Sequence, residues 1–457
     1  MDFERKILKN LHLWKKDDNR KPLVLRGARQ VGKTTIVRQF SKTYSRYIEL
    51  NLEKLEHLEL IEQSKSVGQL VDVISLRFKI SPSEWKNTLL FIDEIQESPK
   101  AIGFLRFFHE EFSAIHIITA GSLLEHSLHK TQHFPVGRIN YLYLFPLNFQ
   151  EFLEVTGNEH ILERMKQIPI DNVGHSEAIK LFHTYSIIGG MPEVVKNYNQ
   201  YNDIKRLTPI YESIWNTYKD DISKYASSPS EQKVIQHVIN SSSALVDQRI
   251  KFQNFGNSNY KSREIGEAFR SLDMAKVIQI IYPCTETEPP ALPNKRKSPR
   301  LQILDTGLLN FDINIQAQLL TMDNLSSAYK GAIIPHIITQ ELISLNQGSY
   351  EKPKFWVRDK TQSSAEVDLV RSFKGLLIPI EIKSGATGSL RSLHQFIDQA
   401  PHNYAVRIYG GEFKIESTKT RKGKKFQLMN LPYYLGTLID IYLYYFIGSE
   451  NRNLRKP

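Results

Sequence analysis

The chain contains a single cysteine, Cys284, among its 457 residues. One thiol excludes a disulfide framework and any zinc site that needs several cysteines. No uninterrupted apolar run is long enough to span a membrane, and residues 1–6 lack the apolar core of a signal peptide. Internal repeats, low-complexity segments and a Ser-His-Asp arrangement are also missing from the sequence. We therefore expect a cytoplasmic protein with no membrane partner.

The overall composition is that of a soluble globular protein, with 41% hydrophobic and 24% charged residues. A chain of this length is expected to fold into about two to four domains. It carries 60 Lys and Arg against 49 Asp and Glu, a formal charge of +11. This surplus favours a polyanionic partner, of which nucleic acid is the first candidate.

The most informative stretch is GARQVGKT at residues 27–34, which fits the phosphate-binding pattern GxxxxGK[ST]. A strand-like run precedes it and a helical pattern follows, so backbone N–H groups and a helix N-terminus converge on one anion site. Lys33 is expected to reach the β- and γ-phosphates of ATP, and the Thr34 hydroxyl to bind Mg²⁺. The predicted nucleotide-binding residues are Gly27, Ala28, Arg29, Gln30, Val31, Gly32, Lys33, Thr34 and Thr35.

A second informative stretch, LLFIDE at residues 89–94, is an apolar run that ends in two acids. It predicts a buried parallel strand that carries the acids to the ligand edge of a sheet. Asp93 is expected to hold Mg²⁺, and Glu94 to polarise the water that attacks the γ-phosphate.

The next predicted strand, residues 115–122, ends in small polar residues. Thr119 or Ser122 is able to sense the γ-phosphate, and a cap for the following helix is an equally good interpretation. An amphipathic helix at 3–14, a strand at 47–51 and helices over 53–78 complete the pattern. Together these elements predict an α/β fold with a doubly wound parallel sheet.

The segments 26–35, 93–96, 119–122, 137–138 and 145–152, in this order, resemble the prokaryotic AAA-type ATPases, close to the archaeal and bacterial ATPase superfamily. Residues 189–193, GGMPE, resemble the helical lid region of that family. The resemblance implies that Arg138 lies near the nucleotide as a sensor or as an arginine acting on a neighbouring subunit. A Gly-Arg turn that only packs the backbone is the competing interpretation.

The middle of the chain, residues 211–284, is predicted to be mainly helical. A helix at 262–272 followed by a strand at 277–281 resembles a winged helix, a module that either reads DNA or serves only for packing. Residues 285–300 form a proline-containing linker with the basic patch Lys295-Arg296-Lys297, and Arg300 follows just beyond it. Such a patch either contacts a phosphate backbone or is simply solvated, and we favour solvation.

In the C-terminal third, residues 304–309 and the segment from Gly331 onward resemble a domain of uncharacterised function that commonly follows this ATPase domain in bacteria and archaea. Residues 365–370 and 379–383 within it resemble a PD-(D/E)xK nuclease core. They are expected to pair as strands that bring Asp368, Glu381 and Lys383 together. The resemblance implies that both carboxylates hold a second divalent metal and that Lys383 assists the attacking water. An ordinary salt-bridge ladder is the alternative.

Pro335 stands where the nuclease family usually has a glutamate, and Glu341, six residues further along the helix, faces another way, so the first acid of the metal site is expected to be lost or displaced. A degenerate core that binds DNA or a protein is at least as well supported as an active nuclease. Nearby, the basic run 419–425 is either a DNA contact or a solvated turn.

The predicted organisation is an AAA-type ATPase core at 1–155, a helical lid at 156–210, a winged-helix-like region at 211–284, a linker at 285–300 and a nuclease-like domain at 301–457. The first functional hypothesis is an ATPase that uses ATP and Mg²⁺ as a switch or motor on double-stranded DNA. The second is a nucleotide-gated switch for protein interactions, and the third is an ATP-regulated, metal-dependent nuclease. A homo-oligomer or a protein partner stays open.

Overall fold

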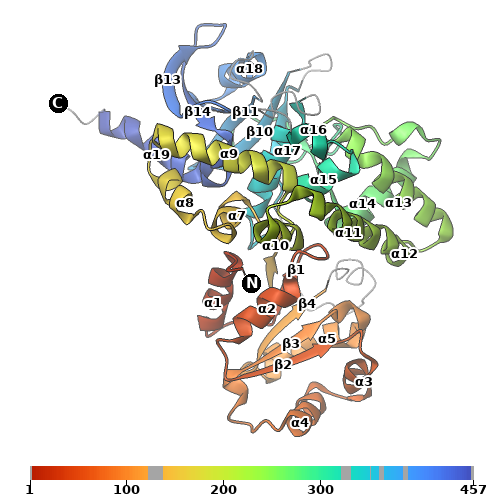
Figure 1. The fold of residues 1–457 in the computed structure, drawn as a ribbon. Coiled ribbons are helices and arrows are strands. Elements are labelled where there is room, and N and C mark those ends of the chain that lie inside the picture. Colours follow the sequence, from red (N-terminus) through yellow and green to blue (C-terminus); the bar gives the residue numbers. More distant parts are fainter. Residues whose placement is uncertain are drawn as a thin grey trace.

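The computed structural model describes residues 3–121, 137–320, 331–349, 351–359, 365–383 and 390–453. The N-terminal part forms one lobe, at the bottom of Figure 1, and the remaining elements form a larger lobe above it. No helix in the described ranges is long and apolar enough to cross a membrane.

The lower lobe is a five-stranded sheet in the order β2-β3-β4-β1-β5, and every neighbouring pair of strands is parallel. Its elements are α1 (Ile7–Lys16), β1 (Leu23–Arg26), α2 (Lys33–Ser41), β2 (Arg46–Asn51), α3 (Leu55–Gln63), α4 (Val67–Phe78), β3 (Thr88–Asp93), α5 (Pro99–Glu111), β4 (His116–Ala120) and β5 (Asn140–Tyr143). The predicted parallel α/β sheet is confirmed.

Helices cover both faces of this sheet because its strands are apolar on both sides. Leu23 and Leu25 pack with α1 and α2 in one buried cluster, whereas Val24 between them packs with α3, α4 and α5 in another. Parallel strands end at the same edge, so the loop after β1 and the acids that end β3 become neighbours.

The upper lobe begins with helices and one two-stranded sheet, β6-β8. Its elements are α7 (Phe149–Val155), α8 (Glu159–Lys166), α9 (Asn172–Ile188), α10 (Pro192–Tyr201), α11 (Thr208–Asp220), α12 (Ile222–Tyr225), α13 (Pro229–Ser242), α14 (Ser262–Met274), β6 (Ile278–Ile281), β7 (Pro283–Cys284), β8 (Arg300–Ile303), α15 (Thr306–Asp312) and α16 (Gln316–Leu320). The mainly helical middle is confirmed. The helix and strand expected at 262–272 and 277–281 are α14 and β6, and a winged-helix assignment remains a prediction.

The C-terminal region is built on a mixed seven-stranded sheet in the order β13-β14-β12-β11-β10-β9-β7. Its elements are α17 (Ile333–Ser344), β9 (Lys354–Val357), β10 (Glu366–Phe373), β11 (Leu376–Ile382), α18 (Arg391–Gln399), β12 (Tyr404–Tyr409), β13 (Lys414–Lys419), β14 (Lys425–Pro432) and α19 (Ile439–Asn453). β7 lies before the predicted linker and yet pairs with β9, so the sheet draws strands from both sides of that segment. The domain boundaries given above remain predictions.

Three distant segments meet with almost no space between their backbones: residues 145–148, 188–191 and 305–307. We call this meeting point the junction. The Leu147 N–H donates to the Gly190 carbonyl over 2.7 Å, and the Gly190 N–H donates to the Asp305 carboxylate over 2.6 Å. A Cβ at Gly190 would lie 1.9 Å from the Leu147 oxygen. Glycine at position 190 is therefore a steric requirement of the fold.

Substituting this glycine tests that requirement. Gly190→Ala should lower the free energy of unfolding by about 3 kcal/mol or more, because the backbone of residue 147 cannot move away from a methyl group without breaking the junction. A thermal unfolding scan measures the loss. Gly348→Ala is the matched control, since a Cβ there has no neighbour within 4 Å. Equal melting temperatures for the two variants would contradict the requirement.

Candidate nucleotide-binding site

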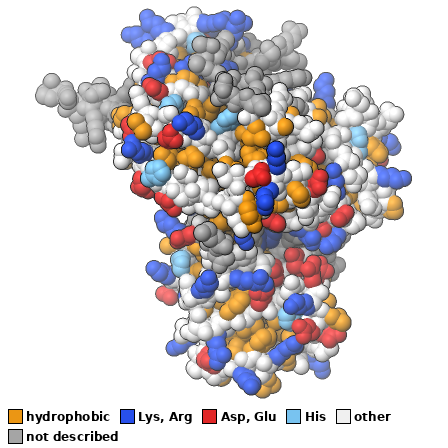
Figure 2. All heavy atoms as spheres, viewed as in Figure 1, with side chains coloured by type: hydrophobic (Ala, Val, Ile, Leu, Met, Phe, Trp, Pro, Cys, Tyr) orange, Lys and Arg blue, Asp and Glu red, His pale blue; other side chains and the backbone are white. Residues whose placement is uncertain are grey.

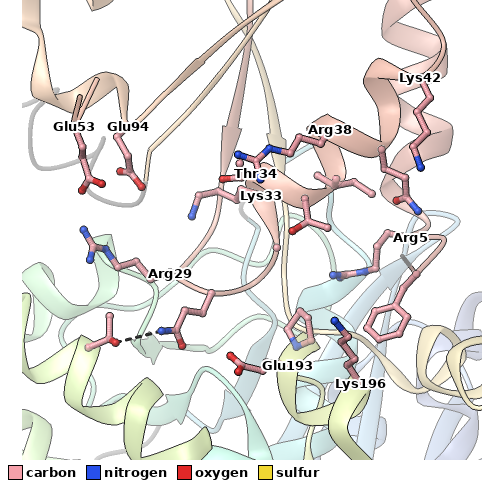
Figure 3. A pocket seen from close by; sticks show the side chains of 18 residues that line it. Arg5, Arg29, Lys33, Thr34, Arg38, Lys42, Glu53, Glu94, Glu193 and Lys196 are labelled. Atoms are coloured by element: carbon pink, nitrogen blue, oxygen red, sulfur yellow. Dashed lines mark hydrogen bonds between the residues drawn. The ribbon is translucent and has the colours of Figure 1, made fainter. Parts of the chain in front are cut away.

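A cavity of 840 Å³ opens between the two lobes above the phosphate-binding loop. The loop and α2 supply one side, Glu53 and Glu94 a second, and α10 and α11 a third (Figure 3). The lining residues are Phe3, Arg5, Arg29, Gln30, Gly32, Lys33, Thr34, Thr35, Ile36, Arg38, Gln39, Lys42, Glu53, Glu94, Pro192, Glu193, Lys196 and Thr217. Six of the nine predicted nucleotide-binding residues thus face one space, whereas Ala28 and Val31 are buried beneath it.

Two glycines give the loop its shape. Gly27 has φ of 152° and Gly32 has φ of 95°, a region that side chains with a Cβ rarely adopt. At Gly27 a Cβ would also lie 2.3 Å from the carbonyl oxygen of Leu144, which follows β5. The sequence therefore needs glycine at both ends of the loop, so that the chain can turn from β1 into α2.

Lys33 is the first residue of α2 and its side chain is only 8% exposed. Its ammonium group donates to the carbonyl oxygens of Gly27 over 3.0 Å and Ala28 over 2.8 Å. Burial lowers the pKa of Lys33 to about 8, although the charges of Glu94 and Asp93 act in the opposite direction. The lysine is bound by two neutral carbonyls, which an anionic ligand is able to replace.

Thr34 and Asp93 are brought together from α2 and β3. The Thr34 hydroxyl donates to Asp93 Oδ2 over 2.7 Å, and the Glu94 N–H donates to Asp93 Oδ1 over 3.1 Å. Burial raises the pKa of Asp93, and these hydrogen bonds oppose the rise. A hydroxyl and a carboxylate are the hard oxygen ligands that suit Mg²⁺, so this pair fits the metal that the sequence predicted.

Glu94 follows the strand in the left-handed conformation, with φ of 50°, and its side chain lines the cavity. Its Oε2 accepts a hydrogen bond of 2.5 Å from the Gln96 amide. Gln96 is itself held near the end of β4, where a Cβ at Gly121 would lie 2.2 Å from the Gln96 oxygen. The amide therefore orients Glu94, a role that the sequence interpretation did not assign to Gln96.

The remaining predicted residues are less closely associated with the cavity. Thr119 is fully buried in β4 and does not line it, and the Thr119 hydroxyl has no hydrogen-bond partner within the described ranges. Ser122 lies outside the described residues. Arg138 is 48% exposed and donates from Nε to Glu110 of α5 over 2.9 Å, so it does not reach this cavity.

Helices of the upper lobe hold the loop from outside. Arg29 forms an ion pair of 2.8 Å with Asp221, which follows α11, and the Tyr218 hydroxyl donates to the Arg29 carbonyl over 2.9 Å. The Gln30 amide donates to the Thr217 hydroxyl over 3.2 Å. These contacts place α11 against the tip of the loop, and the position of the loop depends on the upper lobe.

A buried arginine, Arg5, contacts the loop from behind, and no sequence pattern marks this residue as functional. Its guanidinium donates to Val31 O over 3.3 Å, to Phe145 O over 2.7 Å and to Glu151 Oε1 over 3.0 Å. Arg5 is 7% exposed and Glu151 2% exposed. Asn148 and Glu151 also form a capping box at the start of α7, a pattern visible in the sequence as Asn-x-x-Glu before an apolar run.

Glu341 of α17 reaches the same helix start from the C-terminal region. Its carboxylate accepts the Phe149 N–H over 3.0 Å and the Tyr185 hydroxyl over 2.6 Å. Burial raises the pKa of Glu341 to about 7. Glu341 therefore points to α7 and α9, in agreement with the prediction that it does not replace the glutamate expected at Pro335.

The predicted nuclease-like residues do lie together. Asp368 of β10 accepts the Ile382 N–H at Oδ2 over 2.8 Å, and Lys383 donates to Glu381 Oε1 over 2.7 Å. Burial, followed by the nearby charge of Asp368, raises the pKa of Glu381 to about 7. Within the part of the chain that the structure describes, no three His, Cys, Asp or Glu side chains are arranged to hold a metal ion.

Arg300, the residue just beyond the predicted basic patch, has a different environment from the solvated one we favoured for that patch. Its side chain is 13% exposed and pairs with Asp247, Glu366 and Asp368. By contrast, Lys297 forms an ion pair with Asp359 over 3.3 Å, and Asp359 is 75% exposed. Neither the charge run nor the periodicity of the sequence distinguishes Arg300 from Lys297, because the tertiary fold decides which cation meets partly buried carboxylates.

Comparison with known proteins agrees with the geometry of the first lobe. Residues 19–153 match a family model described as an AAA domain. Residues 179–319 and 330–434 match two models described as domains of unknown function, DUF8612 and DUF4143. Residues 19–153, with their parallel sheet and phosphate-binding loop, are therefore similar to AAA domains.

Among solved structures, the chain is similar to the Walker-type ATPase PABY2304 of Pyrococcus abyssi, with 16% identity and a TM-score of 0.44. The similarity covers 68% of this chain and 96% of that one. A search of curated proteins finds no match. The match at 330–434 assigns no activity, so the nuclease-like core remains a prediction.

The pKa of Lys33 leads to a pH prediction. Below pH about 8 the ammonium is already present, whereas above it a proton must be taken up on binding a triphosphate. ATP affinity should thus be constant at neutral pH and fall by up to about tenfold per unit at higher pH. Titrating a fluorescent ATP analogue across this range measures the change.

Lys33→Arg is the matched variant, because a guanidinium keeps its proton throughout this range. Its affinity, whatever its value at neutral pH, should not decrease as the pH is raised. A parent protein whose affinity is equally flat would show that Lys33 does not titrate near pH 8 in the free state.

Proposed function

We propose that this chain binds ATP with Mg²⁺ and hydrolyses it at the cavity between the two lobes. The observation that carries the proposal is the pairing of the Thr34 hydroxyl with the Asp93 carboxylate beside Lys33, at the mouth of a phosphate-binding loop. Thr34 and Asp93 would hold the metal, which supplies charge neutralisation to the phosphates when bound. The backbone N–H groups of residues 27–35 and the Lys33 ammonium would bind the phosphate oxygens.

Glu94 is the proposed general base. Its carboxylate lines the cavity and is oriented by the Gln96 amide, so it is placed to accept a proton from a water molecule that attacks the γ-phosphate. Pro192, Glu193 and Lys196 of α10 cover the other side of the cavity. We assign this helix to a lid, in keeping with the predicted lid at 156–210, that limits the access of bulk water during hydrolysis.

Arg138 is assigned no role within its own subunit. Its guanidinium is 48% exposed on the α5 side of the lobe, away from the cavity that its own chain forms. A catalytic role for Arg138 therefore requires a second copy of the chain whose nucleotide it would approach, a role proposed from resemblance alone.

Glu94→Gln tests the hydrolysis step. The amide keeps the size and position of the side chain but cannot accept a proton, so turnover should fall by about a hundredfold or more while ATP binding is retained. Phosphate release and fluorescent-nucleotide binding provide the two measurements. Glu97→Gln, an exposed change three residues away, is the control and should match the parent. Normal turnover in Glu94→Gln would exclude Glu94 as the base.

We further propose that the ATPase acts on double-stranded DNA, with the tip of the β13–β14 hairpin as a contact for phosphates. We call residues 419–425 the basic tip. Lys419 and Lys425 face each other in the strand register, and Arg421 and Lys422 lie exposed in the turn between them. None of these four cations forms an ion pair within the described ranges. Figure 2 shows Lys and Arg side chains gathered over this hairpin at the top of the molecule.

The basic tip is held in place by hydrogen bonds of Thr420 and Lys424, which do not involve the four cations named above. The Thr420 hydroxyl donates to Asp398 over 2.6 Å, and Lys424 donates to the carbonyls of Ile397 and Ala400 at the end of α18. Like charges opposite each other in a strand pair are unfavourable, and a polyanion would remove that repulsion. A fixed turn with four outward cations supports a phosphate-binding surface.

The double substitution Arg421→Ala/Lys422→Ala should weaken DNA binding and reduce the salt dependence of log K by roughly 2, since each lost phosphate contact contributes about 0.9. Binding to a labelled duplex at several salt concentrations measures both quantities. Lys65→Ala/Lys86→Ala removes two exposed lysines from the lower lobe and is the matched control. Equal salt slopes in parent and double variant would exclude the basic tip.

If duplex DNA neither binds with a steep salt dependence nor changes ATP turnover, the second hypothesis, a nucleotide-gated switch for protein interactions, replaces the DNA proposal. Its physical support is the contact between Glu341 of α17 and the start of α7, which joins the C-terminal region to the ATPase domain. The third hypothesis, a nuclease, needs a divalent metal at Asp368 and Glu381, with Lys383 beside the attacking water.

A further inference from the structure

The acid cluster of the C-terminal region, Asp247, Glu366, Asp368 and Glu381, is assembled from two parts of the fold. Glu366 and Asp368 lie on β10 and Glu381 on β11 of the seven-stranded sheet. Asp247 comes from the loop after α13, in the helical middle of the chain. Carboxylates this close repel one another, so the cluster needs cations to be stable.

The cation at the centre of the cluster is the guanidinium of Arg300, the first residue of β8. Its Nη1 lies 3.3 Å from Asp247 Oδ1 and its Nη2 lies 3.3 Å from Asp368 Oδ1. The same Nη2 also pairs with Glu366. The guanidinium lies over the Phe355 ring of β9, with 4.8 Å from its carbon to the ring centroid. Three carboxylates and one aromatic face thus enclose a single planar cation, an environment that suits arginine.

Of the four carboxylate oxygens of Asp368 and Glu381, three already accept hydrogen bonds. Asp368 accepts from Arg300 at Oδ1 and from the Ile382 N–H at Oδ2. Glu381 accepts from Lys383 at Oε1, and its Oε2 is buried without a hydrogen-bond partner among the described residues. A divalent ion at this point would face both the guanidinium and the ammonium, and repulsion between the cations would exclude it. The residues present do not fit a resident metal.

We propose that Arg300 is the permanent counter-ion of this cluster, that it takes the place a divalent metal would need, and that it fastens β8 and the Asp247 loop to the C-terminal sheet. β8 pairs with β6 in its own small sheet, so the ion pairs join two separate sheets. The same surface also brings Arg249 within 3.8 Å of Glu366. The cluster is then a structural contact between the middle and C-terminal regions, and the chain does not use it to cleave DNA.

The first test measures bound Mn²⁺ by electron paramagnetic resonance in the full chain. Asp93→Asn is included in every protein to weaken metal binding at the ATPase site. The expected result is that adding Asp368→Asn leaves the amount of bound Mn²⁺ unchanged. Loss of one Mn²⁺ per chain on adding Asp368→Asn would overturn the proposal. Plasmid nicking by the parent chain that needs Mn²⁺ and disappears in Asp368→Asn would also overturn it.

The second test removes the guanidinium. Arg300→Ala leaves the carboxylates without their central cation, so the variant should gain one Mn²⁺ per chain and lose it again when Asp368→Asn is added. Mn²⁺ should raise the melting temperature of Arg300→Ala and not that of the parent. Arg249→Ala, which removes a more exposed cation 3.8 Å from Glu366, is the matched control and should gain no metal.

A folded Arg300→Ala chain that gains no Mn²⁺ would contradict the idea that the guanidinium occupies the metal position. Arg300→Lys covers the case in which the alanine variant does not fold, because it keeps a positive charge and should still exclude Mn²⁺. Gain of one Mn²⁺ per chain by Arg300→Lys relative to the parent would show that charge at this position does not control the site.

Discussion

The arrangement of the nucleotide cavity depends on the junction behind it, where the backbones of residues 147, 190 and 305–307 lie in direct contact. Gly190 is bound on one side to the Leu147 N–H and on the other to the Asp305 carboxylate. Burial raises the pKa of Asp305 to about 6, and the N–H donors of Gly190 and Leu308 oppose the rise. Pro192 begins α10 two residues later and lines the cavity, so the junction lies next to the point where this wall of the cavity begins.

A second set of buried contacts joins the loop itself to the rest of the chain. Arg5 binds the Val31 carbonyl and the Glu151 carboxylate, and Glu341 of α17 binds the start of the same helix that carries Glu151. Buried ion pairs contribute little net stability, because desolvation offsets their attraction, but removing one partner leaves a costly lone charge. The main effect of these contacts is to fix the position of α7 relative to its neighbours. The phosphate-binding loop and the C-terminal region share α7, so neither is able to shift independently of that helix.

The sequence predicted the elements whose cause is local. The loop at 27–34 follows from glycines and a helix start, and the meeting of Thr34 with Asp93 follows because parallel strands end at one edge. It did not predict Arg5, Asp305 or Arg300, since their partners lie in other elements and no period or spacing marks them. The Glu341 contact was also missed, because every residue of α17 is buried and its polar side chains meet partners in other elements that the sequence does not indicate.

The two carboxylate sites of this chain differ in how their charges are balanced. At the candidate nucleotide-binding site, Asp93 is paired with a neutral hydroxyl and Lys33 with neutral carbonyls, so the proposed metal and triphosphate would replace contacts to neutral groups. In the acid cluster, each of Glu366 and Asp368 already has the Arg300 cation, and displacing it would leave a guanidinium 13% exposed without its partners. The cost of that exchange is the desolvation of a full charge. Binding of a metal ion is therefore favoured beside Asp93 and opposed in the acid cluster, although acidic residues of β-strands contribute to both sites.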